Sequence, residues 1–270
     1  MPVSNSKPTR PDANQHRPVV ISIAQNKGGT AKTTTTLNLG AGLAAHGKRV
    51  LLIDLDPQGN LTSGTGIDLA NLENSMYQVF TDRNFGLLDV AQKRIGLMVA
   101  PAHISMVTLE MDLVNRNGRE WILKRKLDAL QGEFDYILID CPPSLGLTVT
   151  NALAASDYVL LPVQTQAYAL YGVPQLMEMI NVIREDLNPD LKILGVLLTF
   201  TNRTRLSREV EEEIKNYFQQ QVFTTSIRQN IRIAEAPLSG QSILTYAPEA
   251  AEDYINLAQE VAQRVNAKSK

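Results

Sequence analysis

An open, doubly wound α/β fold with a mostly parallel sheet and helices on both faces is what the sequence predicts. Two observations support it: short apolar runs recur along the chain, and helical patterns separate most of them. Apolar runs without polar alternation are typical of parallel strands covered on both faces. The runs lie at residues 19–24, 49–54, 95–101, 136–140, 158–163 and 193–199. In such sheets ligands bind at the carboxyl ends of the strands.

The βαβ order is clearest near the start of the chain. An apolar run at 19–24 ends in a Gly-rich turn, and a helical pattern at 32–45 stops at His46 and Gly47. Glycine just past the last periodic residue favours a helix end there. Further helices are expected at 111–131, 206–220 and 250–266, the last with Tyr254, Leu257, Val261 and Val265 on one face.

One domain over residues 18–266 is the expected organisation, with a flexible tail at 1–17 and a short tail at 267–270. The first tail is polar and Pro-rich, which favours disorder. A plain extension is the preferred interpretation, and a basic arm that contacts DNA or a partner, through Lys7, Arg10 and Arg17, is the alternative.

Charge and cysteine content limit the possible functions. The formal net charge is −2, so nucleic acid binding requires a local basic face. Cys141 is the single cysteine, which excludes an intrachain disulfide and favours the cytoplasm. It is interpreted as a small buried hydrophobe rather than a nucleophile. No apolar run reaches the roughly 18 residues of a membrane span, and no signal peptide is recognised.

A phosphate loop is predicted at residues 25–36, QNKGGTAKTTTT, between the first strand and the first helix. Glycine lets backbone N–H groups approach phosphate oxygens, and the helix N-terminus favours an anion. Lys32 is expected on the β- and γ-phosphates, Thr33 on Mg²⁺ and Thr34 on the α-phosphate. The expected nucleotide contacts here are Lys27, Gly28, Gly29, Thr30, Ala31, Lys32, Thr33 and Thr34. A Gly-rich turn without a ligand is the alternative.

The loop departs from the strict G-x-x-x-x-G-K-[ST] pattern, because Asn26 and Ala31 stand where glycines are usual. What is present is K-G-G-x-x-K-T, opened by a second lysine, Lys27. With this deviant form the sequence resembles the ParA/MinD family of P-loop ATPases. DLDPQGN at 54–60 and ILIDCPPS at 137–144 are similar to the switch I and Walker B/switch II segments of that family.

The C-terminal third extends the resemblance to the partition ATPases called ParA or Soj. The segments FTNRTRLSREV, IRQNIRIAEAP and SGQSILTYAP carry it, so the match runs from about residue 19 to about residue 265. Among this family's expected features, the sequence departs at Ala31 and at Gln229, which stands in a stretch that often begins with Pro-Arg.

The resemblance implies a catalytic set of Lys27, Lys32 and Asp56. Lys27 would cross a dimer interface to the partner's nucleotide, and Asp56 would position the attacking water. Asp140 matches the Walker B aspartate, so the implied Mg²⁺ site comprises Thr33, Asp56 and Asp140, with Asp54 in support. A turn-forming role for Asp56, which precedes Pro57, is the alternative. For Asp140 a metal-linked role is favoured, because an unpaired carboxylate at a buried strand end is costly.

The family resemblance also implies the remaining contacts. ATP rather than GTP is expected on this ground alone, with adenine held near Asn202, Ile227, Arg228 and Gln229. DNA contacts are expected at Arg203, Arg205, Arg208 and Arg232, in segments similar to the DNA-contacting surface of partition ATPases. Solvated charges, partly neutralised by Glu209 and Glu211 to Glu213, are the alternative for these arginines.

The implied function is an ATP-dependent homodimer that binds double-stranded DNA non-specifically on the nucleoid. A ParB-like or other cargo-linked protein would stimulate its weak ATP hydrolysis, so that a chromosome, plasmid or protein assembly is segregated or positioned. A membrane-associated positioning ATPase like MinD is the alternative, which needs a lipid-exposed C-terminal amphipathic helix. An iron–sulfur carrier on the same fold is disfavoured, because a cluster bridged across a dimer needs more than one cysteine per subunit.

Overall fold

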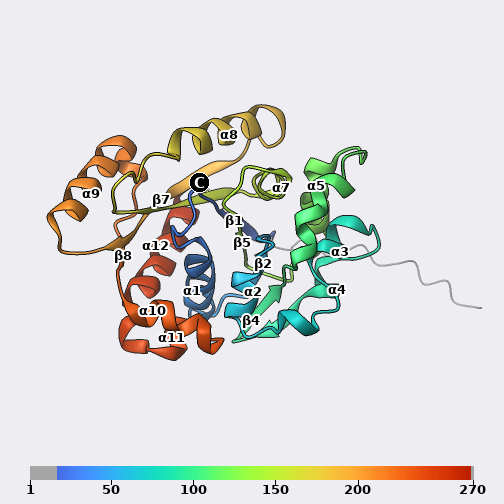
Figure 1. The fold of residues 1–270 in the computed structure, drawn as a ribbon, viewed down its shortest axis with the longest axis horizontal. Helices are drawn as coiled ribbons and strands as arrows, with labels where there is room; N and C mark the ends of the chain where they lie inside the picture. Colours follow the sequence, from blue (N-terminus) through green and yellow to red (C-terminus); the bar gives the residue numbers. More distant parts are fainter. Residues whose placement is uncertain (1–16, 269–270) are drawn as a thin grey trace, which may run out of the picture.

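The computed structural model describes residues 17–268, and one eight-stranded sheet runs through them (Figure 1). The strands are β1 (Val19–Ile23), β2 (Val50–Asp54), β3 (Gln92–Arg94), β4 (Leu97–Ala100), β5 (Tyr136–Asp140), β6 (Tyr158–Gln164), β7 (Lys192–Thr201) and β8 (Ile227–Arg228). Their order is β3-β4-β2-β5-β1-β6-β7-β8. β3 and β4 are antiparallel, and the other neighbours are parallel. The predicted mostly parallel sheet is confirmed.

Helices cover both faces of this sheet (Figure 1). They are α1 (Lys32–Ala45), α2 (Asn60–Gly64), α3 (Met76–Thr81), α4 (Leu87–Val90), α5 (Leu109–Asp112), α6 (Ile122–Leu127), α7 (Leu147–Ala155), α8 (Val173–Asp186), α9 (Arg205–Phe218), α10 (Ile231–Glu235), α11 (Ile243–Tyr246) and α12 (Glu252–Lys268). Because successive strand residues point to opposite faces, two core clusters form. One joins the sheet to α3–α9, and the other joins it to α1, α2 and α10–α12.

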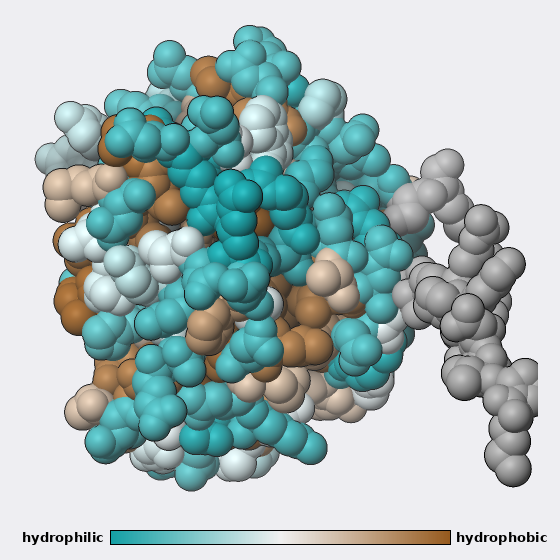
Figure 2. All heavy atoms as spheres, turned by 90° about the vertical axis from the view of Figure 1, so that its right-hand side faces the viewer, coloured by the Kyte–Doolittle hydropathy of each residue, from teal (hydrophilic) through white to brown (hydrophobic). Residues whose placement is uncertain are grey.

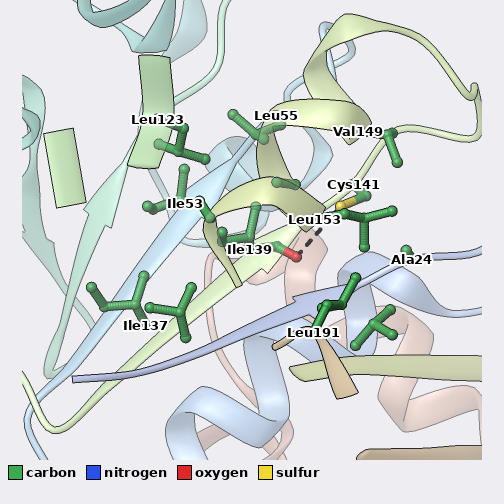
Figure 3. Packing of buried hydrophobic residues seen from close by; sticks show 14 of the residues in the cluster. Ala24, Ile53, Leu55, Leu123, Ile137, Ile139, Cys141, Val149, Leu153 and Leu191 are labelled. Carbon is green, nitrogen blue, oxygen red and sulfur yellow. Dashed lines mark hydrogen bonds between the residues drawn. The ribbon is translucent and has the colours of Figure 1, made fainter. Parts of the chain in front are cut away.

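Figure 3 shows the first cluster around the central strands. Ile139 of β5 lies beside its register partner Ile53 of β2, and Leu153 comes from α7. Cys141 follows β5 and is 1% exposed, and burial, with the charge of Asp140, raises the pKa of its thiol. A buried thiol of this kind is a weak nucleophile. The interpretation of this cysteine as a buried hydrophobe is confirmed.

Predicted and observed helix boundaries agree best where apolar residues recur with a clear helical period. α1 has the predicted bounds, and α9 and α12 each differ from prediction by one or two residues. The continuous helix predicted over 111–131 is wrong, because α5 ends at Asp112 and α6 begins at Ile122. Asn115, Asn117 and Gly118 separate them, and Gly118 has a φ of 66°. These residue types favour turns over helix.

β3 is not predicted from the sequence, because its three residues are polar. It is formed by a tight turn in which Ile95 and Gly96 have φ values of 46° and 80°. Consecutive residues with positive φ match the right-handed twist of a two-stranded hairpin. The antiparallel edge of the sheet therefore depends on a turn that lacks the usual Asn-Gly pair.

α12 buries its apolar side against α1. Ala258 and Tyr254 lie so close to Gly42 of α1 that a methyl group there would meet both. The predicted packing of this C-terminal helix on the core is thus confirmed, although the helix continues to Lys268, into the segment expected as a tail. The expected N-terminal tail lies outside the described residues except Arg17, which pairs with Asp157 at 3.2 Å. Within residues 17–268, no helix is long and apolar enough to cross a membrane.

Candidate nucleotide-binding site

The predicted phosphate loop joins the carboxyl end of β1 to the start of α1. β1 is a central strand between β5 and β6, so the loop lies where ligands bind in this fold class. No side chain of residues 17–268 caps the amino end of α1. The first N–H groups of that helix are therefore available to an anion, as phosphate binding requires.

Ala31 has a left-handed backbone conformation, with φ 68° and ψ 29°, directly before α1. Glycine adopts this conformation without cost, whereas a residue with a Cβ pays about 1 kcal/mol or more. The glycine that the strict pattern places here is thus explained by the backbone, and the chain keeps the conformation despite the substitution. Gln164 at the end of β6 donates from Nε2 to the carbonyl of Gly29 and holds the loop from the other side.

A cavity of 730 Å³ opens over the loop. Its lining includes the predicted residues Gly28, Gly29, Thr30, Ala31, Lys32, Thr33, Thr34 and Asp56. These residues come from the segments after β1 and β2, two strands that flank β5, so the fold brings the loop and Asp56 to one space. Lys27 is not among the lining residues, but its carbonyl oxygen accepts a hydrogen bond from Lys32 Nζ at 3.1 Å.

Lys32 is almost fully buried, at 7% exposure. Burial lowers the pKa of its ammonium group, and the nearby carboxylate of Asp140 opposes that shift. A buried cation needs an anionic partner. The side chain is therefore suited to the charge of a phosphate placed over the loop.

Asp140 and Thr33 form the candidate cation site. Thr33 Oγ1 donates to Asp140 Oδ2 at 2.7 Å, and the carboxylate is fully buried. Burial, together with the negative charge of Asp54, raises the pKa of Asp140 well above 3.8. A hydroxyl and a carboxylate oxygen are the hard ligands that Mg²⁺ prefers. Among the residues described, no three His, Cys, Asp or Glu side chains cluster to hold a metal, so phosphate and water would complete the shell.

Asp54 anchors the segment that carries Asp56. Its carboxylate accepts the backbone N–H groups of Asp56 at 3.1 Å and Thr62 at 2.9 Å, and the Thr62 hydroxyl at 2.7 Å. Asp56 Oδ1 accepts the Gln58 N–H at 3.0 Å, which is the turn-forming role considered as the alternative. Because Asp56 also lines the cavity, the turn and a role at the nucleotide are compatible.

A second cavity, of 70 Å³, adjoins the first and shares Ala31, Thr34 and Phe200 with it. Ile227 and Arg228 line it, as expected for the adenine contacts. Asn202 and Gln229 do not line it; both are exposed, with Asn202 Nδ2 3.4 Å from Gln229 Oε1. Two of the four residues expected near adenine thus line this cavity, and the adenine assignment stays a prediction.

Several lining residues were not predicted from the sequence. They are Gln58, Asn60, Ser63, Gly64, Pro143, Phe200, Pro237 and Leu238. Gln58, Asn60, Pro143 and Pro237 lie in segments quoted for the resemblance, so their motifs carried a signal. Phe200 opens the quoted segment FTNRTRLSREV, but its place at the cavity was not predicted, because it depends on a register irregularity of β7 and a φ of 55°. Such bulges redirect side chains near sites.

The predicted DNA-contacting arginines lie after the carboxyl ends of two adjacent strands. Arg203, Arg205 and Arg208 follow β7, and Arg232 follows β8; all four are exposed. Arg205 pairs with Glu209 at 2.7 Å, so part of its charge is neutralised as the alternative supposes.

Arg228, a further basic residue of this region, is bound on both sides. Its guanidinium contacts Asp253 at 2.7 Å and Glu252 at 2.9 Å, and these bonds raise its pKa. Arg203, Arg208 and Arg232 have no ion pair among residues 17–268, although Arg208 donates to the carbonyl of Arg203 at 3.1 Å, so these three are the predicted arginines open to a phosphate.

An uncapped helix after a central strand, with two buried aspartates on neighbouring strands, defines a P-loop nucleotide-binding fold. A family model described as an AAA domain matches residues 19–193. The chain is 48% identical over 248 residues to sporulation initiation inhibitor protein Soj of Bacillus subtilis, which covers 90% of this chain and 98% of Soj. It is 44% identical to chromosome partitioning protein ParA of Myxococcus xanthus, over 93% of this chain and 90% of that protein.

The solved structures include cobyrinic acid a,c-diamide synthase from Mycobacterium smegmatis with bound ADP and magnesium. It is 34% identical, has a TM-score of 0.83, and the match covers 93% of this chain and 96% of the synthase. The chain belongs to the ParA/Soj family of deviant Walker A P-loop ATPases.

Proposed function

We propose that this protein is an ATP-dependent switch that forms a homodimer, binds DNA without sequence preference in its ATP state, and releases it on hydrolysis. A cargo-bound partner of the ParB type stimulates hydrolysis, so that a chromosome, plasmid or protein assembly is segregated or positioned on the nucleoid. The observation that carries the proposal is the cavity in which residues 28–34 and Asp56 meet. The 48% identity to Soj over 90% of the chain supports the cellular role.

The phosphate loop and Lys32 bind and orient the triphosphate in this proposal. Backbone N–H groups at the start of α1 and the Lys32 ammonium stabilise its negative charge, which grows on the transferred group during the reaction. Mg²⁺, held by Thr33 and Asp140, supplies further charge neutralisation when bound. Asp56 orients the water and accepts its proton through a carboxylate that reaches the same cavity.

Dimer formation follows from Lys27 acting on the nucleotide of the second copy. Its main chain is fixed by the bond from Lys32, while its side chain is half-buried at the rim of the loop. A lysine supplied across an interface ties association to the bound triphosphate, much as an arginine finger does.

DNA binding would use Arg203 and Arg232, with Arg205 and Arg208 in support. With a formal net charge of −2, a single subunit has little general attraction for DNA. Two subunits joined by ATP would present two such sets at once, and the second contact would be intramolecular. Affinity for DNA is thereby linked to ATP.

Two other functions are less well supported. A membrane-associated switch would need the apolar face of α12, but that face packs against α1. The synthase among the solved structures is 34% identical to this chain, less than either partition protein.

The test is binding to a non-specific DNA duplex with ATP, with ADP and without nucleotide, at several salt concentrations. Binding that requires ATP and weakens steeply with salt would support the proposal, because each neutralised phosphate adds about 0.9 to the logarithmic salt slope. Absence of DNA binding in every nucleotide state would leave the ATPase function but remove DNA as its binding surface, and liposome binding would then test the membrane alternative.

A further inference from the structure

The amino end of α7 is capped by a side chain from a distant helix. Leu147 is the first residue of α7, and Gly146 before it has no side chain to offer. Instead, Glu110 Oε1 accepts the Leu147 N–H at 2.8 Å. A carboxylate here stabilises the helix in two ways, because the hydrogen bond is charge-assisted and because the helix N-terminus carries partial positive charge.

Gly146 shapes the contact as well. Its φ of −87° is accessible to any residue, so backbone freedom does not explain the glycine. A methyl group at this position would overlap Glu110 Oε1. The missing side chain is therefore what allows the carboxylate to reach the backbone of α7.

Glu110 is presented from a braced segment at the surface. Asp112, two residues further on in α5, accepts a hydrogen bond from Tyr77 at 2.9 Å, which ties α5 to α3, and a local one from Thr108 at 2.6 Å. α5 lies on the right-hand side of Figure 1, and Figure 2 shows that this side of the molecule mixes hydrophilic and hydrophobic residues. Glu110 itself is exposed and has no ion pair within residues 17–268, so the hydrogen bond from the Leu147 N–H is its main polar interaction there.

The contact lies at the end of the segment that leads from the cation site. Asp140 closes β5, Pro143 lines the nucleotide cavity, and α7 begins at Leu147. Beyond that point α7 is fixed in the core by Val149 and Leu153, which are 1% and 0% exposed. The loop 141–146 is thus held by β5 at one end and by the amino end of α7, with its Glu110 bond, at the other.

We propose that Glu110 is a positioning residue for ATP hydrolysis: by holding the amino end of α7 it fixes the loop 141–146, and with it Pro143, beside the reacting phosphate. This inference rests on the proposed ATPase function. α5 is far from the phosphate loop in the sequence, and the bond from Leu147 to Glu110 links it to the nucleotide site through the loop 141–146. Glu110 touches neither nucleotide nor water in this role.

The test compares Glu110→Ala with Glu110→Gln, whose amide oxygen can accept the same N–H. The exposed Glu185→Ala on α8 is the matched control. Single-turnover ATP hydrolysis, ATP affinity and hydrogen exchange of the Leu147 amide are measured on the full chain. In Glu110→Ala we expect exchange to be about three- to tenfold faster and hydrolysis to be slowed about as much, in line with loss of one helix cap. ATP affinity should stay within about twofold, since the phosphate loop is unchanged.

Glu110→Gln should recover most of both losses. Gly146→Ala should reproduce the alanine defect, and adding it to Glu110→Ala should cost little more, because both remove the same contact. Unchanged exchange and hydrolysis in Glu110→Ala, or equal defects in Ala and Gln, would overturn the inference. Wild-type protein that binds ATP but never hydrolyses it would instead overturn the proposed function, and the inference with it.

Discussion

Asp54 and Asp140 lie opposite each other at the carboxyl ends of the parallel strands β2 and β5, and both are fully buried. Burial is the main cause of the raised pKa of each, and the negative charge of Asp54 adds to the effect on Asp140. Their partners differ, since Asp140 accepts from Thr33 in the phosphate loop and Asp54 from Thr62 in α2. One aspartate therefore faces the candidate cation and the other shapes the loop that carries Asp56.

The first prediction concerns stability against pH in nucleotide-free protein. The pKa of Asp54 is about 6 in the folded chain, above its ordinary value of 3.8. The folded state thus binds this proton more tightly, so the stabilisation is complete below pH 3.8 and is lost as pH rises through about 6. Asp54→Asn removes the titration. The free energy of unfolding of wild type minus that of the variant should rise by about 1–3 kcal/mol as pH falls from about 7.5 to about 4.5.

Chemical denaturation at several pH values measures this difference. The subtraction cancels the titration of carboxylates that Asp54 does not influence, provided that both proteins unfold in one cooperative step. The charge of Asp54 raises the pKa of Asp140, so the variant lowers that pKa and its contribution adds to the difference in the same direction. A difference that stays constant over the whole range would show that Asp54 does not titrate in this window.

The second prediction separates the roles proposed for Asp56 and Lys27. Asp56→Ala should leave ATP binding and ATP-dependent dimerisation intact while slowing hydrolysis about a hundredfold, the usual scale for losing a positioned acid or base. Lys27→Ala should lose the ATP-dependent dimer while one subunit still binds ATP. Single-turnover hydrolysis and sedimentation with and without ATP give the two readouts. Full activity in Asp56→Ala would refute its role at the water.

The parts of the site formed by one continuous motif could be predicted from the sequence, but the parts that depend on strand register and packing could not. The phosphate loop was predictable, because a strand, a glycine pair, a lysine and a helix follow one another within residues 19–45. Phe200 was not, since its place between two cavities depends on an irregular register and a positive φ in β7. The prediction of a continuous helix around Trp121 failed for a different reason. The charged residues there have good helix propensity, and they were given more weight than the turn residues Asn117 and Gly118.

The third prediction tests the strained backbone at Ala31. With a φ of 68°, Ala31→Gly should relieve the left-handed strain, while the freer unfolded chain offsets part of the gain. The variant should be between unchanged and about 1 kcal/mol more stable than wild type. Ala262→Gly, in the middle of α12, is the matched control and should lose about 1 kcal/mol. Equal destabilisation at both positions would mean that Ala31 carries no such strain.

The fourth prediction concerns the surface that reaches DNA. Arg232 is exposed without an ion pair in the described part of the chain, so Arg232→Ala should weaken ATP-dependent DNA binding. The logarithmic salt slope should fall by about 1 for each DNA phosphate that the variant no longer neutralises. Dimerisation with ATP should be unchanged. Lys48→Ala removes an equal charge, but Lys48 precedes β2 and so lies at the amino ends of the parallel strands, whereas Arg232 follows the carboxyl end of β8. The DNA affinity of Lys48→Ala should therefore match that of wild type.

Fluorescence anisotropy over a salt series decides between the two interpretations of these arginines. If both variants bind like wild type at every salt concentration, the charge of Arg232 is solvated and takes no part in binding. If both weaken equally, the attraction comes from overall charge, and no particular face of the protein carries it.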